Sequence, residues 1–441
     1  MTSPTSAYDQ IRHTVLRWIE DQKVDPTDEL EIRERTAEAI RHWQRSAAAS
    51  ERRSLGDVEA IADRVVGSIT GFGALQELFA APGIEEIEIE GDLVMYVDAS
   101  GRRKTLVAPT TEEENRQAVD RLLAATHRHL DTQSPLVHAR VLDGRARLSV
   151  AIPPVADKLS ATIRFHRLRN ESLSTMVARG SLTVPAAGFL WAVAQTRLSL
   201  IISGPPFAGK TSMLGALLAA VPPTRRIRVC EDTRELVDER PTISYMEARA
   251  KSLGGEGEIT LRDLIKFVLK MRPDYIVVGE VLGAEAFEIV RAVNAGCGFA
   301  CTVHANSARD ALTALVNAAI MAGENVKSAD VREVFASSIR YVMHLEVAER
   351  GLATGGGQGL LRQTREIIEL VPSLHDNFSH EVLFSREALG RPLEWTGTIP
   401  HHAEVIDRSL PDGLTVGDIL RGHVSPFELG LTAISQGVVA P

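Results

Sequence analysis

Apolar residues recur at helical spacing through the first 70 residues of the chain. Four of them share one face of a helix: Ile11, Val15, Trp18 and Ile19. A turn at Pro26–Asp28 separates this helix from a second one, expected at Glu29–Arg45, and a third is expected at Glu51–Thr70. Charged residues fill most other positions. Residues 1–70 are therefore interpreted as a small, solvated helical appendage rather than as a source of catalytic groups.

The pattern changes to alternation in the next hundred residues. In Ile84–Gly91, apolar and acidic residues alternate from Glu86 onward, which is typical of a half-buried strand. The other expected elements are helices at Leu75–Ala80 and Glu112–Ala125 and strands at Leu93–Val97, Leu142–Ile152 and Ala161–Phe165. A hairpin turn is expected at Ser100-Gly101. Residues 71–170 are thus predicted to form an α+β domain, which leads into a linker helix at Asn170–Ala178.

Strands and helices alternate from about residue 180 to residue 350, the pattern of a parallel sheet covered by helices. The expected strands are Leu198–Ile202, Arg226–Cys230, Tyr275–Val278, Phe299–Val303 and Tyr341–Val347. The expected helices are Met213–Ala220, Leu261–Lys270, Ala284–Asn294 and Ala308–Met321. After a Gly-rich break at Gly351–Gly359, the tail shows strands at Glu366–Leu370 and Glu381–Phe384 and a helix near Val416–Arg421. Residues 171–441 are predicted to form the third and largest domain.

Composition narrows the functional class. The 441 residues carry a formal net charge of −9, which disfavours a broadly basic, nucleic-acid-binding face. Three cysteines, Cys230, Cys297 and Cys301, are too few for a disulfide framework and favour a reducing compartment. There is no signal-peptide pattern at the start, and polar residues interrupt the most apolar run, around Pro185–Ser203. We therefore expect a cytoplasmic protein that reaches a membrane only through partners.

The most informative motif is Gly-Pro-Pro-Phe-Ala-Gly-Lys-Thr at 204–211, which follows an apolar strand and precedes a helical stretch. This order matches a phosphate-binding P-loop, in which glycines let the backbone approach phosphate and the helix N-terminus points amides at it. Lys210 would reach the β- and γ-phosphates, and the Thr211 hydroxyl would hold Mg²⁺. The residues expected to contact nucleotide are Gly204, Ala208, Gly209, Lys210, Thr211 and Ser212. An accidental Gly-rich turn is the alternative, and both flanks disfavour it.

A second nucleotide signal lies at 272–280. Four apolar residues, Tyr275–Val278, form a buried strand that ends near Glu280. In P-loop enzymes such a strand lies beside the P-loop strand and delivers a carboxylate to Mg²⁺ or to the attacking water. Glu280 is therefore expected to be catalytic and, together with Thr211, to bind the metal. The alternative is a surface glutamate that caps the next helix.

An acidic segment, Val229–Leu236, follows another strand. Carboxylates at such strand ends line the crevice where ligands bind in parallel sheets, so Glu231 and Glu235 are further catalytic candidates. The sequence leaves open which of the two acts on water. Asp232 in the same segment is alternatively a helix cap.

His304 lies at the end of a fourth strand, in the segment Cys301–Asn306. A histidine there would hydrogen-bond a γ-phosphate and report its presence, although a lone histidine is more often structural. Cys297 and Cys301 give His304 a spacing that imitates a zinc site, but the segment has no second ligand pair and has the pattern of a strand.

These motifs together resemble the secretion ATPase superfamily, the motors of type II and type IV secretion and of pilus assembly. The matching boxes are the P-loop, Glu-Asp-x-x-Glu-Leu, Met-Arg-Pro-Asp before a strand ending in Gly-Glu, and Thr-x-His-Ala-Asn. The resemblance runs from about Gly71 to His344 and includes Asp-Gly-Arg-Ala-Arg at 143–147, Ile-Pro-Pro at 152–154 and Thr-Ile-Arg at 162–164. The helical unit, with Gly-Phe-Gly-Ala-Leu-Gln-Glu-Leu-Phe at 71–79, is most similar to the CpaF-like branch, which drives Tad (Flp) pilus assembly.

The resemblance implies an α/β fold: a RecA-like P-loop ATPase domain preceded by an α+β domain and a small helical unit. It also implies a homohexamer that uses ATP and Mg²⁺, with ATP between the two larger domains. Arg140, Arg147 and Arg164 match family positions that clamp phosphate oxygens, although each is alternatively a solvated surface residue. Arg272, expected to contact nucleotide, and Arg262 match arginines that act within or across a subunit interface.

Some residues depart from the family pattern. Pro205 and Pro206 remove backbone donors from the P-loop, and Phe207 replaces a glycine for which a positive φ is expected. The other departures are Leu282 in place of arginine, Glu90 in place of asparagine and His138 in place of aspartate. The chain is interpreted as a divergent member whose turnover is slow or partner-dependent.

The sequence thus predicts a Mg²⁺-dependent ATPase that forms a hexameric ring on an inner-membrane platform and has no direct nucleic-acid contact. Glu280, with Glu235 or Glu231, would promote attack by water. One alternative is a traffic ATPase for conjugation or effector secretion. Another is a nucleotide-binding assembly subunit with little catalysis, which Phe207 and Leu282 suggest. A DNA-translocating motor is disfavoured by the acidic balance.

Overall fold

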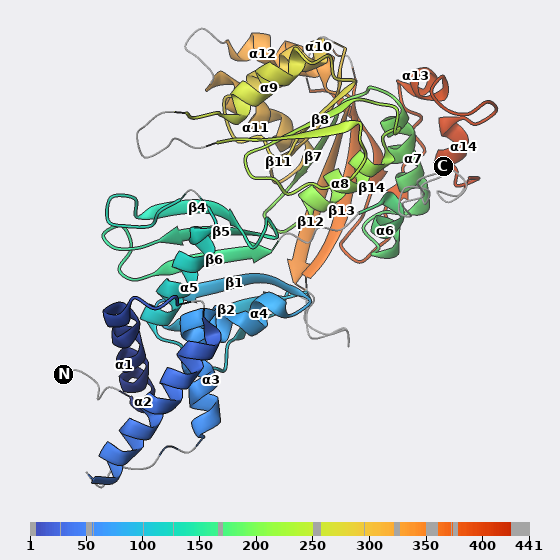
Figure 1. Ribbon diagram of the computed structural model, residues 1–441. Coiled ribbons are helices and arrows are strands. Elements are labelled where there is room, and N and C mark those ends of the chain that lie inside the picture. The colour runs from blue at the N-terminus through green and yellow to red at the C-terminus, as the bar shows by residue number, and fades with distance from the viewer. Residues whose placement is uncertain are drawn as a thin grey trace, which may run out of the picture. The chain divides into compact units, whose positions relative to one another are not determined.

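The computed structural model describes residues 6–26, 28–49, 55, 57–99, 101–126, 128–165, 171–249, 257–294, 296–321, 327–349, 360–371, 373 and 378–424 (Figure 1). Contacts divide the chain into two compact units, Met1–Arg167 and Leu168–Pro441. They are called the first and the second unit below. The Gly-rich break expected at 351–359 lies outside the described residues.

Three helices open the first unit: α1 (Ala7–Gln22), α2 (Glu29–Ala49) and α3 (Val58–Thr70). Ile11 and Val15 are buried in the small core that these helices share, as their spacing predicts. The third helix begins later than expected, at Val58, because the Asp57 side chain caps its first turn. Residues 51–54 and 56, which were expected in this helix, lie outside the described residues.

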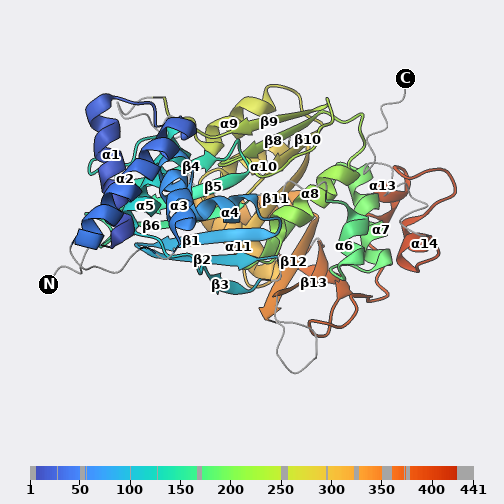
Figure 2. The same cartoon turned by 60° about the horizontal axis from the view of Figure 1, so that its bottom comes forward.

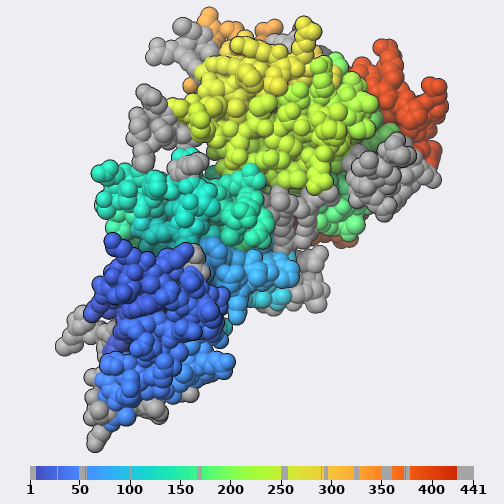
Figure 3. All heavy atoms as spheres, viewed as in Figure 1, coloured from blue at the N-terminus to red at the C-terminus, as the bar shows by residue number. Residues whose placement is uncertain are grey.

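The helical segment packs against the helix α5 (Glu112–Ala124) of the same unit. The Arg121 guanidinium of α5 donates to three carbonyls at the end of α3, which have no partners within their own helix. Arg12 of α1 is 5% exposed and donates to the Gln117 side chain of α5 at 2.6 Å. The three helices form one continuous body on the face drawn in Figure 3. These hydrogen bonds attach the helical segment to α5 of the first unit.

Six antiparallel strands form the sheet of the first unit, in the order β3-β2-β1-β6-β5-β4. They are β1 (Ile84–Glu90), β2 (Leu93–Asp98), β3 (Arg103–Thr105), β4 (Leu136–Val141), β5 (Ala146–Ala151) and β6 (Ser160–Phe165). Ile87 and Ile89 of β1 point to one face, where they are fully buried with α5 and the short helix α4 (Gln76–Ala80). The alternation read from the sequence is confirmed in this strand.

The strand expected at Leu142–Ile152 is confirmed only from Ala146 to Ala151, as β5, and its first residues form a turn instead. The chain reverses at 142–144, where three successive residues have φ values of 54°, 54° and 83°, so that β4 and β5 form a hairpin. Asp143-Gly144 is a strong turn signal, but the apolar residues on either side of it resemble one continuous strand. The hairpin expected at Ser100-Gly101 does join β2 and β3; Ser100 itself lies outside the described residues.

A nine-stranded sheet organises the second unit, in the order β15-β14-β13-β12-β7-β11-β10-β8-β9. The mutually parallel strands are β7 (Leu200–Gly204), β8 (Ile227–Glu231), β9 (Ile243–Glu247), β10 (Tyr275–Val278), β11 (Gly298–His304) and β12 (Tyr341–Glu349). The antiparallel strands are β13 (Leu360–Leu370), β14 (His380–Ser385) and β15 (Glu394–Trp395). The helices are α6 (Leu173–Ala178), α7 (Val184–Gln195), α8 (Lys210–Ala220), α9 (Leu261–Leu269), α10 (Ala286–Asn294), α11 (Ala308–Ile320), α12 (Ser328–Ser338), α13 (Ala403–Asp407) and α14 (Val416–Leu420).

Helices cover both faces of this sheet, as Figures 1 and 2 show. Leu200 and Ile202 of β7 pack in the core formed with α6, α7 and α8, whereas Ile201 between them packs in the core formed with α9 to α12. Each central strand is therefore apolar on both sides, as in parallel sheets generally. The expected RecA-like α/β fold, preceded by an α+β part, is confirmed.

The order of the central strands differs from the expectation in one respect. The strand before Glu280, β10, does not lie beside the P-loop strand β7, because β11 lies between them. Cys301 of β11 is opposite Ile201 of β7 on one side and Val278 of β10 on the other. Helical crossovers of similar length permit either order, so periodicity alone does not determine it.

The pattern also missed whole elements, among them β9, α7 and α12. The helix α7 buries eight of its residues and has no polar face, so its apolar run carries no helical period. Among the described residues, no helix is both long and apolar enough to cross a membrane.

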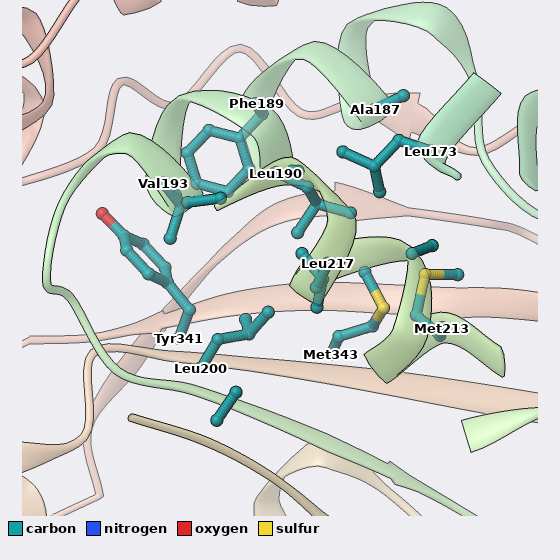
Figure 4. Packing of buried hydrophobic residues seen from close by; sticks show 14 of the residues in the cluster. Leu173, Ala187, Phe189, Leu190, Val193, Leu200, Met213, Leu217, Tyr341 and Met343 are labelled. Carbon is teal, nitrogen blue, oxygen red and sulfur yellow. The ribbon is translucent and has the colours of Figure 1, made fainter. Parts of the chain in front are cut away.

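The core beside α7 holds a group of aromatic rings. Phe189 of α7 is fully buried, with its ring centroid 5.3 Å from that of Tyr341 and 5.7 Å from that of Phe384. Figure 4 shows Phe189 and Tyr341 among the aliphatic side chains of the same cluster. These contacts join α7 to β12 and β14, the two strands that flank β13.

A buried carboxylate fastens the tail to the sheet. Glu369 of β13 accepts hydrogen bonds from the backbone N–H groups of His401 and His402, at 2.7 and 3.1 Å, and lies 2.6 Å from His402 Nδ1. Burial raises the pKa of Glu369, but these hydrogen bonds outweigh burial and hold the pKa below its ordinary value. The ionised carboxylate therefore holds the start of α13 on β13.

Replacing Phe189 with alanine should destabilise the second unit by about 3–5 kcal/mol, because the substitution leaves a cavity among well-packed rings. Denaturant unfolding of the full chain, followed by circular dichroism, measures the loss. Val184→Ala on the same helix is the control: Val184 is 36% exposed, and a change of only about 0.5 kcal/mol is expected. Equal losses in the two variants would contradict this account of the core.

Candidate active site

The candidate catalytic residues of the second unit gather at one edge of its sheet. The P-loop follows β7, Glu231 ends β8, Glu280 follows β10 and His304 ends β11. Because these strands are parallel, their carboxyl ends meet at the same edge, which is where ligands bind in α/β sheets. The fold therefore brings together the four sequence segments that were predicted separately.

Glycine is required where the P-loop leaves β7 and where α8 begins. Gly204 has a φ of 156°, and a Cβ atom there would come within 2.6 Å of the Leu345 carbonyl oxygen. Gly209 has a φ of 89° and immediately precedes the first helical residue, Lys210. Ala208 is buried between them. The loop therefore places the free N–H groups of the first turn of α8, which includes Thr211 and Ser212, at the sheet edge.

Lys210 is folded back onto the loop. The residue is only 8% exposed. Its ammonium group donates to the carbonyl oxygens of Gly204 and Pro205, at 3.1 Å each. It also lies 3.0 Å from Nδ1 of His304. A buried ammonium needs such acceptors, and phosphate oxygens would replace them at similar reach.

His304 connects this lysine to Glu280. Because an ammonium group can only donate, His304 Nδ1 accepts a hydrogen bond from Lys210. The ring proton of a neutral His304 is then on Nε2. Nε2 lies 2.6 Å from Glu280 Oε1. The side chains of His304 and Glu280 are 41% and 37% exposed, so a ligand can reach both. The structure thus brings Lys210, His304 and Glu280 into one chain of contacts.

Thr211, an expected metal ligand, contacts the carboxylate of Glu235. Its hydroxyl donates to Glu235 Oε2 at 3.1 Å, whereas Glu280 is bonded to His304. Both partners of this contact are hard oxygen donors, the kind of ligand that Mg²⁺ prefers, and the residues therefore fit such an ion. Of the two acidic candidates left open by the sequence, Glu235 is the one beside the P-loop.

Glu231 supports the segment that carries Glu235. Its Oε1 atom accepts from the backbone N–H groups of Glu235 and Leu236 at 3.0 and 3.1 Å, and the residue is 3% exposed. A Cβ atom on Gly279 would lie 2.8 Å from Glu231 Cγ, so only glycine fits there. No helix follows the segment, and Asp232 therefore caps none. These contacts give Glu231 a positioning role.

Burial perturbs Glu231 strongly. Desolvation raises the pKa of its carboxyl to about 7, although the two backbone hydrogen bonds oppose the shift. Since the protein holds this proton more tightly than the unfolded chain, Glu231 changes charge near neutral pH.

Phe207 has the positive φ that the family pattern requires of a glycine. Its φ is 63°, and 45% of the residue is exposed. A bulky residue in this left-handed region costs about 1–2 kcal/mol of backbone free energy. The Ala208 N–H closes a turn onto the Pro205 carbonyl at 3.3 Å, so the proline-containing loop still folds as a compact turn.

Other departures from the family pattern have local explanations. Leu282 is 66% exposed, and its N–H is bonded to the Glu285 carboxylate at 2.6 Å. Glu90 accepts from the Ser160 hydroxyl at 2.7 Å, and His138 Nδ1 lies 2.9 Å from the Ser149 hydroxyl.

The two further arginines, Arg262 and Arg272, have different surroundings. Arg262 on α9 forms an ion pair with Glu288 at 3.0 Å, and Glu288 is 1% exposed. Arg272 has a φ of 50° in the turn before β10, and no described contact joins it to the P-loop.

In the first unit, three predicted arginines form a row across the sheet. Arg140 of β4 lies opposite Arg147 of β5, which lies opposite Arg164 of β6. Arg140 also donates to the Gly144 carbonyl at 3.2 Å. Like charges directly opposite each other in a sheet repel, and Glu86 of β1, which lies opposite Arg164, is the carboxylate at the end of this row.

The two cysteines of the zinc-like spacing are buried. Cys301 is fully buried, and Cys297 donates its thiol to the Pro273 carbonyl at 3.4 Å. Within the described parts of the chain, no group of His, Cys, Asp and Glu has the arrangement of a metal centre.

Two residues near the loop were missed in the sequence. His344 is 2% exposed and lies 2.9 Å from the Ser203 hydroxyl, just before the P-loop, and burial lowers its pKa. Arg362 of β13 lies near Gly209, where an added Cβ atom would be 4.0 Å from Arg362 Cδ. Neither belongs to a motif, and only the pairing of β12 and β13 beside β7 brings them here.

The model of the type II/IV secretion system protein family matches residues 108–350. The chain belongs to this family. It is 32% identical over 331 residues to a putative conjugal transfer protein of Mycobacterium tuberculosis, covering 73% of this chain and 94% of the relative. It is 28% identical over 294 residues to a probable conjugal transfer protein TrbB of Sinorhizobium fredii, covering 65% and 83%.

Solved structures of lower similarity were also found. The pilus retraction motor PilT with bound ADP is 18% identical, with a TM-score of 0.48, over 69% of this chain and 83% of that one. The VirB11 ATPase of Brucella suis with sulphate is 19% identical, with a TM-score of 0.33, over 65% and 94%. Membership of the type II/IV secretion family rests on the sequence matches.

The raised pKa of Glu231 predicts a pH-dependent stability. Because the folded-state pKa lies above the ordinary value of 4.5, stability that is present at low pH is lost as the pH rises from about 4.5 to about 7. The Glu231→Gln side chain is neutral at every pH. The unfolding free energy of this variant, relative to that of the parent, should therefore rise by up to about 3 kcal/mol between pH 4.5 and pH 7. Unfolding free energies at a series of pH values test this, with the exposed Glu239→Gln as the control. A difference that does not change with pH would show that the buried carboxyl has an ordinary pKa.

Phe207→Gly should raise the stability of the unliganded protein by about 1 kcal/mol, because glycine adopts a φ near 63° without steric cost. Phe207→Ala keeps the Cβ atom and therefore the strain, so it serves as the matched control. Thermal unfolding without nucleotide distinguishes the two variants. Equal midpoints for both would mean that the loop stores no strain at this position.

Proposed function

We propose that this secretion family protein hydrolyses ATP with Mg²⁺ and couples the reaction to mechanical work in a pilus-assembly or secretion machine. The observation that carries this proposal is the chain of contacts from Lys210 through His304 to Glu280, next to a P-loop at the edge of a parallel sheet. Family membership and the P-loop support the same reaction.

Binding would begin with an exchange of partners at Lys210. Its ammonium would leave the carbonyls of Gly204 and Pro205 and bind the β- and γ-phosphates, while the first N–H groups of α8 bind phosphate oxygens. His304 Nδ1 would lose the lysine at the same time. The histidine is therefore placed to respond to the γ-phosphate.

Hydrolysis would use Glu280 as the carboxylate that accepts a proton from the attacking water. Glu280 is accessible and is oriented by the Nε2–H of His304. Glu235, held against Thr211 and supported by Glu231, would act at the same end of the triphosphate. Mg²⁺, when bound, supplies charge neutralisation on the phosphate oxygens. Thr211 and Glu235 would hold it, together with Glu280 as expected from the sequence.

The arginine row of the first unit would supply further positive charge. Three guanidinium groups on one face of the sheet suit the bidentate binding of phosphate oxygens. We infer that Arg140, Arg147 and Arg164 bind the nucleotide phosphates and, through them, couple hydrolysis to movement of the first unit. Arg272 is kept as a further nucleotide-contact candidate on the basis of the resemblance.

The machine is proposed to be a homohexameric ring in the cytoplasm, docked on inner-membrane platform proteins that assemble a Tad/Flp-type pilus. The helical segment at the start of the chain and the resemblance to the CpaF-like branch support this assignment. Direct contact with nucleic acid is not part of the proposal, since the chain is acidic overall.

A second candidate is a traffic ATPase of conjugal transfer. Two matched relatives carry that description, which favours it over other type IV secretion tasks. The genes beside that of this protein would separate the candidates. Pilin and prepilin peptidase genes would support pilus assembly, and relaxase or channel genes would support conjugation.

ATP hydrolysis by the full chain, compared with Glu280→Gln, tests the proposed reaction. The variant should lose at least about 100-fold in kcat, because the proton acceptor is removed, while ATP affinity changes less than tenfold. Steady-state phosphate release and binding of a fluorescent ATP analogue measure the two quantities. Glu404→Gln, at a carboxylate that is 87% exposed on α13, is the matched control and should behave as the parent.

The outcome also decides between a motor and a non-catalytic subunit. A parent that binds ATP but does not turn it over, alone or with its membrane partners, would support a nucleotide-binding assembly role. A Glu280→Gln variant with the activity of the parent would remove Glu280 from the chemistry.

A further inference from the structure

The start of β13 passes directly beside the P-loop. A Cβ atom placed on Gly209 would lie 4.0 Å from Cδ of Arg362, the carbon that carries the guanidinium group, so this side chain is in van der Waals reach of the loop. Arg362 is partly buried, and it lies opposite Val347 of β12. It also lies beyond residue 350, where the match to the family model ends.

The topology explains why an arginine from this strand reaches the loop. β12 pairs with β7 only from Tyr341 to His344, and its later residues continue past the carboxyl end of β7. Because β13 runs antiparallel to β12, its first residues lie at this same end. A Cβ atom on Gly204 would touch the Leu345 carbonyl of β12, which shows how closely this pair borders the loop.

Arg362 and the hydrolytic groups flank the loop on opposite sides. β7 has β11 as one neighbour and β12 as the other. His304, Glu280 and Glu235 belong to β11 and to segments beyond it, on the first side. Arg362 belongs to the second side. The γ-phosphate must face the groups that act on it, so a cation on the far flank faces the part of the nucleotide that ADP and ATP share.

We propose that Arg362 is a nucleotide-binding residue that contacts the phosphates common to ADP and ATP, and not the γ-phosphate. This inference rests on the proposed function, since it assumes that the P-loop binds nucleotide. An arginine there adds a charge-assisted hydrogen bond to the phosphates alongside Lys210. It would hold the diphosphate product as firmly as the substrate, and the site would therefore retain ADP after hydrolysis.

Affinities of the full-length protein for ADP and for a non-hydrolysable ATP analogue test the inference. Arg362→Gln should weaken both by about tenfold, the effect of one lost charge-assisted hydrogen bond. Arg362→Lys keeps the charge and should lie between the parent and Arg362→Gln for both nucleotides. Competition against a fluorescent ADP gives all of these values on one scale.

Arg365→Gln is the matched control. It removes the same charge from the same strand, but the Arg365 guanidinium lies 3.6 Å from the Glu346 carboxylate, so nucleotide affinity should stay at the parent value. Thermal unfolding without nucleotide verifies that each variant is folded. If Arg362→Gln is not folded, the nucleotide affinities of Arg362→Lys test the inference instead: both should be weaker than those of the parent.

Three results would overturn the inference while leaving the proposed function intact. In the first, Arg362→Gln binds both nucleotides with the affinity of the parent. In the second, Arg362→Gln loses affinity for the ATP analogue alone. In the third, Arg365→Gln loses as much nucleotide affinity as Arg362→Gln. A parent that binds neither nucleotide is a different result, because it would overturn the proposed function itself.

Discussion

The buried ammonium of Lys210 is the group on which the candidate site depends. A charge at 8% residue exposure requires acceptors, and the P-loop supplies two of its own carbonyls while His304 supplies a third. This requirement fixes the tautomer of His304 and, through Nε2, the position of the Glu280 carboxylate. The phosphates of a nucleotide would compete for the same ammonium, so the proposed function links nucleotide binding to the arrangement of His304 and Glu280 through one set of hydrogen bonds.

Much of this arrangement could be predicted from sequence because it is local. A P-loop needs glycine at its two ends and a helix directly after it, and these neighbours are adjacent in the chain. Buried strands reveal themselves as apolar runs, and the residues after them fall at one edge when the strands are parallel. Lys210, Glu280 and His304 were therefore identified from short segments, each read with its flanking strand or helix.

The features that sequence did not predict depend on contacts between distant segments. The insertion of β11 between β7 and β10 is a matter of strand order, which no periodicity encodes. The contact of Thr211 with Glu235, and the contacts of the buried Glu231 with the acidic segment, likewise depend on how separate segments fold together. Arg362 belongs to no motif at all. The hairpin at Leu142 was missed for a different reason, since an apolar residue there takes a positive φ that is unusual for it.

The close approach of Gly279 and Glu231 has a consequence for how this site can vary. These residues come from two different sequence boxes. The methylene groups of Glu231 occupy the space that a side chain at position 279 would need. A larger residue at 279 would push Glu231 away from the two N–H groups that it holds, and the displacement would reach Glu235. The two boxes are thus sterically interlocked: a larger residue at 279 fits only with a smaller side chain at 231.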